Sequence, residues 1–186
     1  SKPFALMAPL DAVRDECELS PEEEALLMSP RRPIVLLRRR VHSRIAESVA
    51  PSNRYLGFML PYTPVHHILF SYIMKPLVMT SANLSESPMI YRNEEILGSG
   101  LADFCLVHNR EILARCDDSV AFVEKGREML TRRSRGYAPQ PIEARVREGI
   151  LACGPHMKNT FAMTLDGRVI ISQHIGDLEE SYPFYE

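Results

Sequence analysis

Short apolar runs, each ended by proline, glycine or polar residues, recur along the first two thirds of the chain. Runs of four to eight residues bounded in this way are typical of buried strands. This pattern predicts strands at residues 4–8, 33–37, 55–60, 76–80 and 102–107.

Helices are expected between several of these strands. Ser20 followed by Pro21 and three glutamates is typical of a helix start, because serine caps the first turn and acidic residues suit the positive end of the helix dipole. An apolar helix is predicted at residues 65–73 and a short one at 93–97. Strands that alternate with helices predict an α/β fold.

Two later segments have the pattern of β-hairpins with a glycine in a two-residue turn. They are residues 119–132 around Lys125-Gly126 and residues 160–172 around Asp166-Gly167.

The chain changes character near Pro139-Gln140-Pro141, because two prolines in three residues suit neither a helix nor a central strand. We expect one domain over residues 1–143, a linker over 144–148 and a new unit over 149–186. The new unit opens with a predicted strand at 150–154 and is too short to bury a core alone.

Composition narrows the class of protein. The 186 residues carry 22 basic and 24 acidic groups, a net charge of -2, which argues against a dedicated nucleic-acid binder. The sequence has no apolar run long enough to cross a membrane and no apolar signal segment at its start. The four cysteines are widely spaced without a CxxC pair, which favours a reducing compartment and predicts no metal site in this chain. We therefore expect a cytoplasmic protein.

The loop that follows the predicted strand at 76–80 carries candidate ligand-binding groups. Thr80, Ser81 and Asn83 offer two hydroxyls and an amide beyond a strand end, where nucleotides and phosphates bind in open α/β sheets. The alternative is a polar turn whose side chains bond their own backbone.

A second set joins Ser119, at a strand start, to Arg133 and Arg135 at the end of the partner strand. Arginines can bind phosphate oxygens with two parallel hydrogen bonds. Arg133 and Arg135 would share a face of an extended strand. The alternative is an edge strand protected by its charge.

Weaker candidates lie elsewhere. Lys158, Asn159 and Thr160 follow Gly154 in a loop that could hold a phosphate, although its spacing is not that of a Walker sequence and a plain turn also explains it. His174 precedes a polar turn, whereas His66-His67 on an apolar helix favour a place at the core boundary.

An arginine-rich stretch remains open in meaning. Eighteen of the 22 basic residues are arginine, and six of them lie between Arg31 and Arg44. This stretch could bind an anionic partner, or it could be a solvated surface balanced by nearby glutamates. No nucleophile set is recognisable, so no catalytic side chain is assigned.

Seven segments occur together in one order: residues 2–7, 60–67, 80–85, 117–120, 132–139, 158–161 and 172–178. Their joint pattern closely resembles the HypF family of carbamoyltransferases in [NiFe]-hydrogenase maturation. The resemblance implies a YrdC-like twisted open α/β sheet followed by the first strands of an ASKHA-type, Kae1-like domain. Family members are much longer, so we expect a fragment that lacks the start of the YrdC-like domain.

The resemblance also implies residue roles and ligands. Ser81 and Asn83 match the Ser-x-Asn element of YrdC-like nucleotide sites, with Thr80 beside them, and Ser119, Arg133 and Arg135 complete that set. The second ATP site of the Kae1-like domain would include Lys158, Asn159, Thr160 and, with less support, His174. ATP and Mg²⁺ are expected, and zinc only in the upstream region that this chain lacks.

The reaction that the resemblance implies starts from carbamoyl phosphate and ATP. It forms carbamoyl adenylate and passes the carbamoyl group to the C-terminal cysteine of HypE, for the cyanide ligands of the hydrogenase iron. Membrane or nucleic-acid partners are not expected. The alternatives are a threonylcarbamoyl-adenylate synthase of tRNA modification and a non-catalytic RNA-binding module that uses Arg31 to Arg44.

Overall fold

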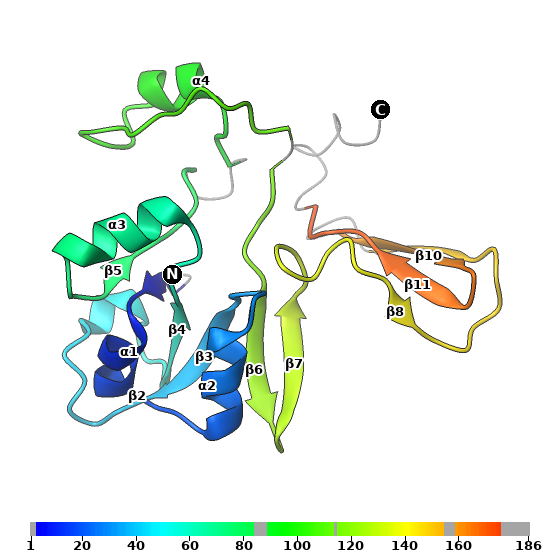
Figure 1. The fold of residues 1–186 in the computed structure, drawn as a ribbon, viewed down its shortest axis with the longest axis horizontal. Helices are drawn as coiled ribbons and strands as arrows, with labels where there is room; N and C mark the ends of the chain where they lie inside the picture. The colour runs from blue at the N-terminus through cyan, green and yellow to red at the C-terminus, as the bar shows by residue number, and fades with distance from the viewer. Residues whose placement is uncertain (1–2, 84–88, 114, 155–158, 176–186) are drawn as a thin grey trace. The chain divides into compact units, whose positions relative to one another are not determined.

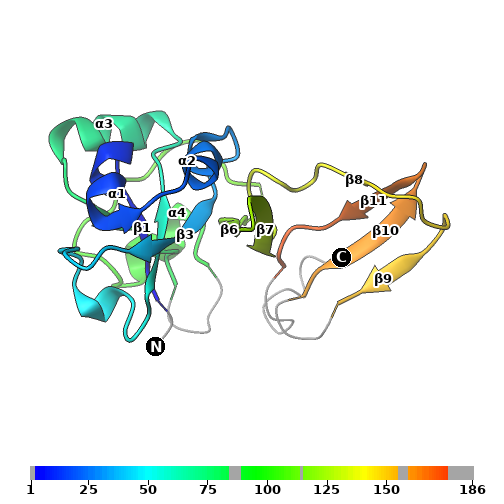
Figure 2. The ribbon, with the colours of Figure 1, turned by 90° about the horizontal axis from the view of Figure 1, so that it is seen from below.

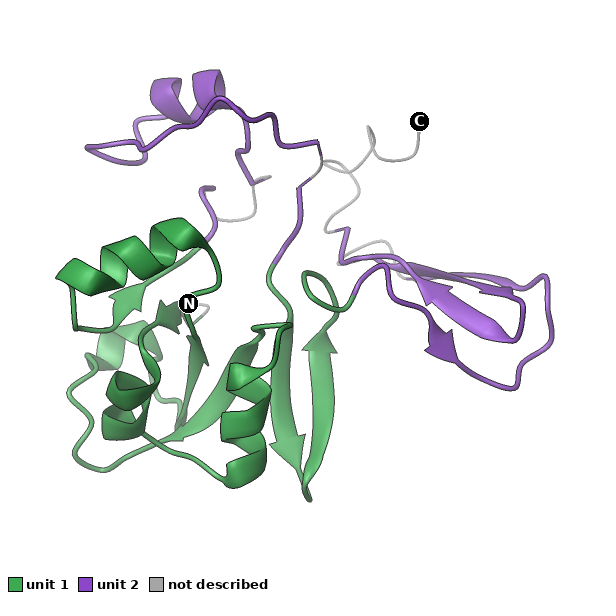
Figure 3. Ribbon diagram, in the orientation of Figure 1, with its two compact units in different colours: residues 1–80, 118–137 green, residues 81–117, 138–186 purple. Residues whose placement is uncertain are grey.

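The computed structural model describes residues 3–83, 89–113, 115–154 and 159–175. The chain forms two compact units (Figures 1 and 3). Unit 1 combines residues 1–80 with 118–137, and unit 2 combines 81–117 with 138–186. In the part that the structure describes, no helix is long and apolar enough to cross a membrane.

Unit 1 is built on a mixed sheet with the strand order β5-β1-β4-β3-β6-β7, and β2 pairs with β3 beside this path. Its strands are β1 (Ala5–Met7), β2 (Cys17–Glu18), β3 (Ile34–Arg39), β4 (Tyr55–Met59), β5 (Leu77–Val78), β6 (Val120–Glu124) and β7 (Arg127–Arg132). The β1–β4 and β3–β6 pairs are parallel, and the other pairs are antiparallel. The α/β prediction is confirmed.

The helices of unit 1 are α1 (Leu10–Glu16), α2 (Pro21–Met28), α3 (Pro64–Tyr72) and the 3-10 turn η1 (Glu47–Val49). Figure 2 shows α1 and α2 together against one face of the sheet. The predicted start of α2 is confirmed: the Ser20 hydroxyl accepts the Glu23 N–H, and the Glu23 carboxylate accepts the Ser20 N–H. The core beneath these helices contains Leu6, Val13, Leu27, Val35, Leu37, Leu56 and Phe58.

The hairpin of β6 and β7 turns at Lys125 and Gly126, where φ is 51° and 73°. Two consecutive positive φ values are those of the tight turn that matches the twist of paired strands, so the predicted hairpin is confirmed.

Unit 2 contains α4 (Asn93–Gly98) and an antiparallel four-stranded sheet with the order β8-β11-β10-β9. The strands are β8 (Ile142–Glu143), β9 (Leu151–Cys153), β10 (Phe161–Leu165) and β11 (Arg168–Ile171). Asp166 and Gly167 again have positive φ values, 52° and 68°, which confirms the second predicted hairpin. The boundaries at 143 and 149 stay a prediction.

Two strand predictions differ from the structure. The segment 102–107 has no strand, because Phe104 and Leu106 stay exposed and the described residues supply no partner strand beside it. The predicted strand 76–80 shrinks to Leu77–Val78, since only these two residues pair with β1. Apolar runs alone did not distinguish a strand from an exposed segment.

Candidate functional site

The predicted anion-binding residues lie along one edge of the unit 1 sheet. This edge is the side where strands begin or end and is not an outer strand. Because β3 and β6 are parallel to each other and β7 is antiparallel to β6, the start of β6 and the end of β7 meet at this edge. Ser119 lies just before β6, and Arg133 and Arg135 follow β7. The edge also receives the start of β3, preceded by Arg31 and Arg32.

Ser119 holds the loop after β7 in place. Its side chain is fully buried. Its hydroxyl donates to the Arg135 carbonyl at 2.9 Å and accepts the Ser134 N–H at 2.7 Å. The hydroxyl is therefore engaged by the backbone of residues 134 and 135, which suits a residue that shapes the loop.

Arg135 is held on several sides by unit 1. Its guanidinium contacts Asp118 Oδ1 through Nε at 2.8 Å and through Nη2 at 2.7 Å. Nη1 and Nη2 also donate to the carbonyls of Arg31 and Arg32, at 3.3 and 2.9 Å. The Tyr62 ring lies 3.6 Å from the guanidinium carbon. These contacts tie β6, the start of β3 and the loop before α3 to one cation.

Gly136 permits this approach. A Cβ at Gly136 would lie 2.5 Å from the Arg31 carbonyl oxygen, and its φ of 85° is in the left-handed region. Glycine is thus the residue that lets the arginine loop pack directly on the backbone of Arg31.

Arg31 and Arg133 form the second half of the cluster, around Tyr137. The Arg31 guanidinium lies 4.7 Å from the Tyr137 ring centre and contacts Glu128 at 3.6 Å. Arg133 Nη2 donates to the Tyr137 carbonyl at 2.8 Å. Burial, and then the charge of Arg31, lower the pKa of Arg133. Two neighbouring cations that repel each other favour an anion between them.

Tyr137 itself is buried, and its hydroxyl donates to Glu128. Burial, followed by this hydrogen bond, raises the pKa of Tyr137, so the phenol stays protonated and remains a donor. Sequence reasoning did not assign Arg31 or Tyr137 to the site. No local sequence pattern links these residues, because Gly136 packs on the backbone of Arg31, which lies more than 100 residues earlier in the chain.

His66 also contacts Tyr62, with the two rings edge to face and their centres 4.6 Å apart. Its Nδ1 is buried without a hydrogen-bond partner. Burial, and then the charge of Arg135, lower the pKa of His66, which favours the neutral imidazole. The expected place at the core boundary is confirmed for His66, which is half-buried, but is wrong for His67, which is exposed.

The structure does not bring Thr80 to this edge. Leu6 pairs with Val78 and Met7 with Leu77, so the chain leaves β5 toward the start of β1, opposite to the edge that holds Ser119. Ser81 and Asn83 belong to unit 2, where the Ser81 hydroxyl donates to the Asn83 side-chain oxygen. Their role with Ser119 stays a prediction.

The second predicted ATP site lies in unit 2 and is described only in part. Lys158 lies outside the described residues. Asn159 is buried and accepts the Ile175 N–H at its carbonyl, while the Thr160 carbonyl accepts the Gly154 N–H at 2.8 Å. These bonds place Asn159 and Thr160 beside Gly154, and the residue that follows His174 is bonded to Asn159.

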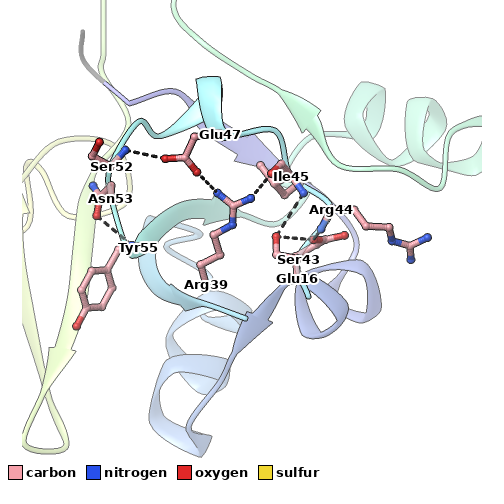
Figure 4. A network of polar contacts seen from close by, with 9 residues as sticks. All are labelled: Glu16, Arg39, Ser43, Arg44, Ile45, Glu47, Ser52, Asn53 and Tyr55. Carbon is pink, nitrogen blue, oxygen red and sulfur yellow. Dashed lines mark hydrogen bonds and ion pairs between the residues drawn. The ribbon is translucent and has the colours of Figure 1, made fainter. Parts of the chain in front are cut away.

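The stretch from Arg31 to Arg44 is largely used within unit 1. Figure 4 shows Arg39 directed at Glu47, 3.2 Å away, and at the Ile45 carbonyl. Buried Glu16 accepts the Ser43 hydroxyl and the Arg44 N–H, both at 2.7 Å.

Its neighbours are engaged in the same way. Arg40 donates to the carbonyls of Arg14 and Cys17, and Arg38 pairs with Glu18 at 3.6 Å. These contacts match the expectation of a surface balanced by acidic residues and leave less of the stretch for an anionic partner.

Among the residues that the structure describes, no three His, Cys, Asp or Glu side chains gather where they could hold a metal ion. The two carboxylates at the cluster, Asp118 and Glu128, are paired with Arg135 and Arg31. The arrangement therefore suits an anion bound by arginines more than a metal centre built by protein ligands.

Two family models match this chain. A family model described as "Telomere recombination", for Sua5, YciO and YrdC proteins, matches residues 1–134. A model described as "HypF Kae1-like domain" matches residues 145–184.

Relatives and solved structures point the same way. Carbamoyltransferase HypF of Synechocystis is 40% identical over 100% of this chain and 25% of its own length. HypF2 of Cupriavidus necator is 42% identical over 95% of this chain and 25% of its own length. The chain thus spans about a quarter of the length of these curated relatives.

A crystal structure of full-length HypF in a phosphate- and nucleotide-bound form has a TM-score of 0.90 and 44% identity, covering 99% of this chain and 30% of its own. A crystal structure of T. kodakarensis HypF has a TM-score of 0.91 and 41% identity, covering 98% of this chain and 25% of its own. Since one family model covers most of the chain and these relatives cover nearly all of it, the chain belongs to the HypF family, with a YrdC-like region followed by part of a Kae1-like region.

Proposed function

We propose that this chain supplies the carbamoyl-adenylate-forming part of a HypF-type carbamoyltransferase. The observation that carries the proposal is the arginine cluster at the sheet edge, with Arg31 and Arg133 around Tyr137, in a chain whose relatives are named carbamoyltransferases. Carbamoyl phosphate is the source of the carbamate, and ATP is the second substrate.

The proposed step needs no protein nucleophile. An oxygen of carbamate attacks the α-phosphorus of ATP, the bond from that phosphorus to the bridging oxygen breaks, and pyrophosphate leaves with the electron pair. The products are carbamoyl adenylate and pyrophosphate. The protein contributes by positioning both substrates and by stabilising negative charge on the phosphate oxygens.

The two arginines of the loop receive different roles in this proposal. Arg133 and Arg31 bind phosphate oxygens, because an anion between them relieves their mutual repulsion; burial first, and then the charge of Arg31, lower the pKa of Arg133. Arg135 positions the loop through Asp118 and the backbone of residues 31 and 32. Ser119 shapes the same loop through its bonds to Ser134 and Arg135, and nucleotide binding by Thr80, Ser81 and Asn83 is proposed on the family resemblance alone.

We extend the proposal to the later steps as the family implies them. The Kae1-like region, with Lys158, Asn159, Thr160 and His174 at a second ATP site, would take part in passing the carbamoyl group to the C-terminal cysteine of HypE. That group would become the cyanide ligand of the hydrogenase iron. A cytoplasmic location fits such a partner.

Mg²⁺ would accompany the nucleotide. The described residues hold no cluster of carboxylates for it, and Mg²⁺ is commonly bound by substrate phosphates with only one or two protein carboxylates. When bound, it would neutralise phosphate charge, while Arg31 and Arg133 orient the same phosphates.

The test is carbamoyl-phosphate-dependent formation of AMP and pyrophosphate from ATP by the intact protein. Arg133→Gln should lower kcat/KM by about 10²-fold or more, as expected when a charged donor to the transition state is lost. Arg38→Gln is the matched control, since Arg38 pairs with Glu18 away from the cluster. Equal rates in Arg133→Gln and Arg38→Gln would refute the role of Arg133.

The 186-residue chain alone should bind ATP weakly and complete no turnover. Complete formation of AMP and pyrophosphate by this chain would contradict that expectation.

A threonylcarbamoyl-adenylate synthase is a second candidate, favoured by the match of residues 1–134 to the YrdC-type family model. The match of residues 145–184 to the HypF Kae1-like domain disfavours it. AMP formation that requires threonine would support this alternative over carbamoyl transfer.

A further inference from the structure

A cavity of about 380 Å³ opens in unit 1 where β1 and β4 end. Pro9 and Leu10 follow β1, and Leu60 and Pro61 follow β4, so all four line it. These two strands are parallel neighbours, with Met7 paired to Met59. Small ligands commonly bind beyond the carboxyl ends of parallel strands, and the volume lies in the range of small-molecule sites.

One face of α3 forms the opposite wall. His67, Phe70 and Ser71 line the cavity together with Met74 just after the helix, at the spacing i, i+3, i+4 and i+7. Phe70, Leu60 and Pro61 are buried. The floor of the cavity is therefore apolar and buried, whereas its α3 wall is formed largely by the exposed His67, Ser71 and Met74.

Three polar residues complete the lining: Arg32, His67 and Ser71. The backbone of Arg32 is held on both sides, because its N–H donates to the Ser29 carbonyl at 3.1 Å and its own carbonyl accepts Arg135 Nη2. The Ser71 hydroxyl donates to the Ile68 carbonyl at 2.7 Å, which leaves its oxygen as an acceptor.

This set of groups selects a class of ligand. An arginine beside an imidazole binds a planar carboxylate with directed hydrogen bonds. The apolar floor favours a ligand whose remaining part is apolar. A single guanidinium is a poor match for a triphosphate, for which the cluster of Arg31 and Arg133 is the better site.

We propose that this cavity binds a small organic acid with an apolar body, at a site beside the arginine cluster, to which it is joined by the bond from Arg135 Nη2 to the Arg32 carbonyl. The inference does not depend on the proposed carbamoyl chemistry, since it concerns binding alone. Arg32 supplies the cation, and Leu60, Pro61 and Phe70 contact the apolar part.

Benzoate is the probe for this site, measured by isothermal titration calorimetry on the intact protein. Benzamide tests the need for a negative charge, and formate tests the need for an apolar body. Benzoate should bind and raise the melting temperature as its concentration increases, because a ligand of the folded state stabilises it. Benzamide and formate should each bind about tenfold more weakly or worse.

Two variants locate the site. Arg32→Asn removes the cation but tolerates the left-handed φ of 45° at this position, and should weaken benzoate binding about tenfold. Ser71→Leu should abolish it by filling the cavity while leaving ATP affinity unchanged. Arg38→Gln, an exposed arginine outside the cavity, should leave benzoate affinity unchanged.

Several results would overturn the proposal. They are no benzoate binding by the intact protein, equal binding of benzamide or formate, or an equal loss in Arg38→Gln and Arg32→Asn. The melting curve of each variant without ligand verifies that it is folded, and if Ser71→Leu is not, Arg32→Asn decides. If the intact protein binds benzoate but forms no AMP from ATP and carbamoyl phosphate, the proposed function is contradicted and the proposed organic-acid site is not.

Discussion

Two hairpins of similar design have different surroundings. Both the β6–β7 and β10–β11 hairpins turn at a residue and a glycine with positive φ. In β6, Ala121 is fully buried and the strand pairs with β3, whereas Phe161, Met163 and Leu165 of β10 are 38–47% exposed. The β10–β11 hairpin also has neighbouring strands, β9 and β8, so the two hairpins differ in the burial of their side chains and not in whether they are paired. Only the first hairpin carries a buried serine, Ser119, that fixes the following arginine loop.

The largest expected effect contrasts the two cores. Phe58→Ala removes a fully buried side chain from the sheet of unit 1 and should cost about 3–5 kcal/mol of unfolding free energy. Phe161→Ala, at a partly exposed position in β10, should cost about 1 kcal/mol or less. Urea unfolding followed by NMR signals from each unit measures both. Equal losses would mean that the two sheets are equally packed, contrary to this comparison.

The second prediction tests the close approach at the end of the first hairpin. Gly136→Ala should destabilise unit 1 by about 2 kcal/mol or more, because the new Cβ would meet the Arg31 carbonyl and the residue has positive φ. Gly126→Ala is the control, since its φ is also positive but nothing lies within 4 Å of a Cβ there. Its cost should be about 1 kcal/mol. Chemical denaturation measures the loss of unfolding free energy in both variants. Similar losses would show that Gly136 has no special role.

The third prediction concerns the ion pair that the first hairpin places at its open end. Arg135→Gln and Asp118→Asn should each cost about 1–3 kcal/mol, and the double variant should cost clearly less than their sum. The reason is that either single change leaves one partly buried charge without its partner. Arg38→Gln with Glu18→Gln, an exposed pair, gives the reference, with coupling below about 1 kcal/mol. Additive losses at Arg135 and Asp118 would show that the pair does not hold the loop.

These comparisons show which features of the fold and of the candidate site can be predicted from the sequence. The turns at Gly126 and Gly167 and the N-cap at Ser20 are local devices, and all three were predicted from neighbouring residues, whereas the returning bond from the Ser20 N–H to Glu23 was not. The role of Arg135 depends on carbonyls of residues 31 and 32, about 100 residues away, which no local pattern encodes. The family resemblance grouped Thr80 with Ser119 in one nucleotide site, but β5 is antiparallel to β1 and leads away from the end of the sheet that holds Ser119. Apolarity likewise predicted a strand at 102–107, although no strand pairs with it among the described residues.

The smallest expected effect is electrostatic and tests the stack of Arg135, Tyr62 and His66 at the same edge. Because burial and the Arg135 charge lower the pKa of His66, the folded state binds fewer protons than the unfolded state between that lowered pKa and the ordinary value of about 6.5. Stability should therefore rise with pH across this window and fall on acidification through it. Asp118 acts in the opposite direction and His67 in the same direction as Arg135.

His66→Gln should flatten this part of the stability–pH curve, and Arg135→Gln should raise the His66 pKa in an NMR titration, since a nearby positive charge disfavours the imidazolium. His67→Gln, on the exposed side of the same helix, is the matched control and should change the curve less. A His66 titration midpoint at or above 6.5 would contradict the burial of its Nδ1 beside Tyr62. In that case the loop after β7 would be fixed but would not bury the nearby His66. The difference between the two hairpins would then depend on Ser119 and Arg135 alone.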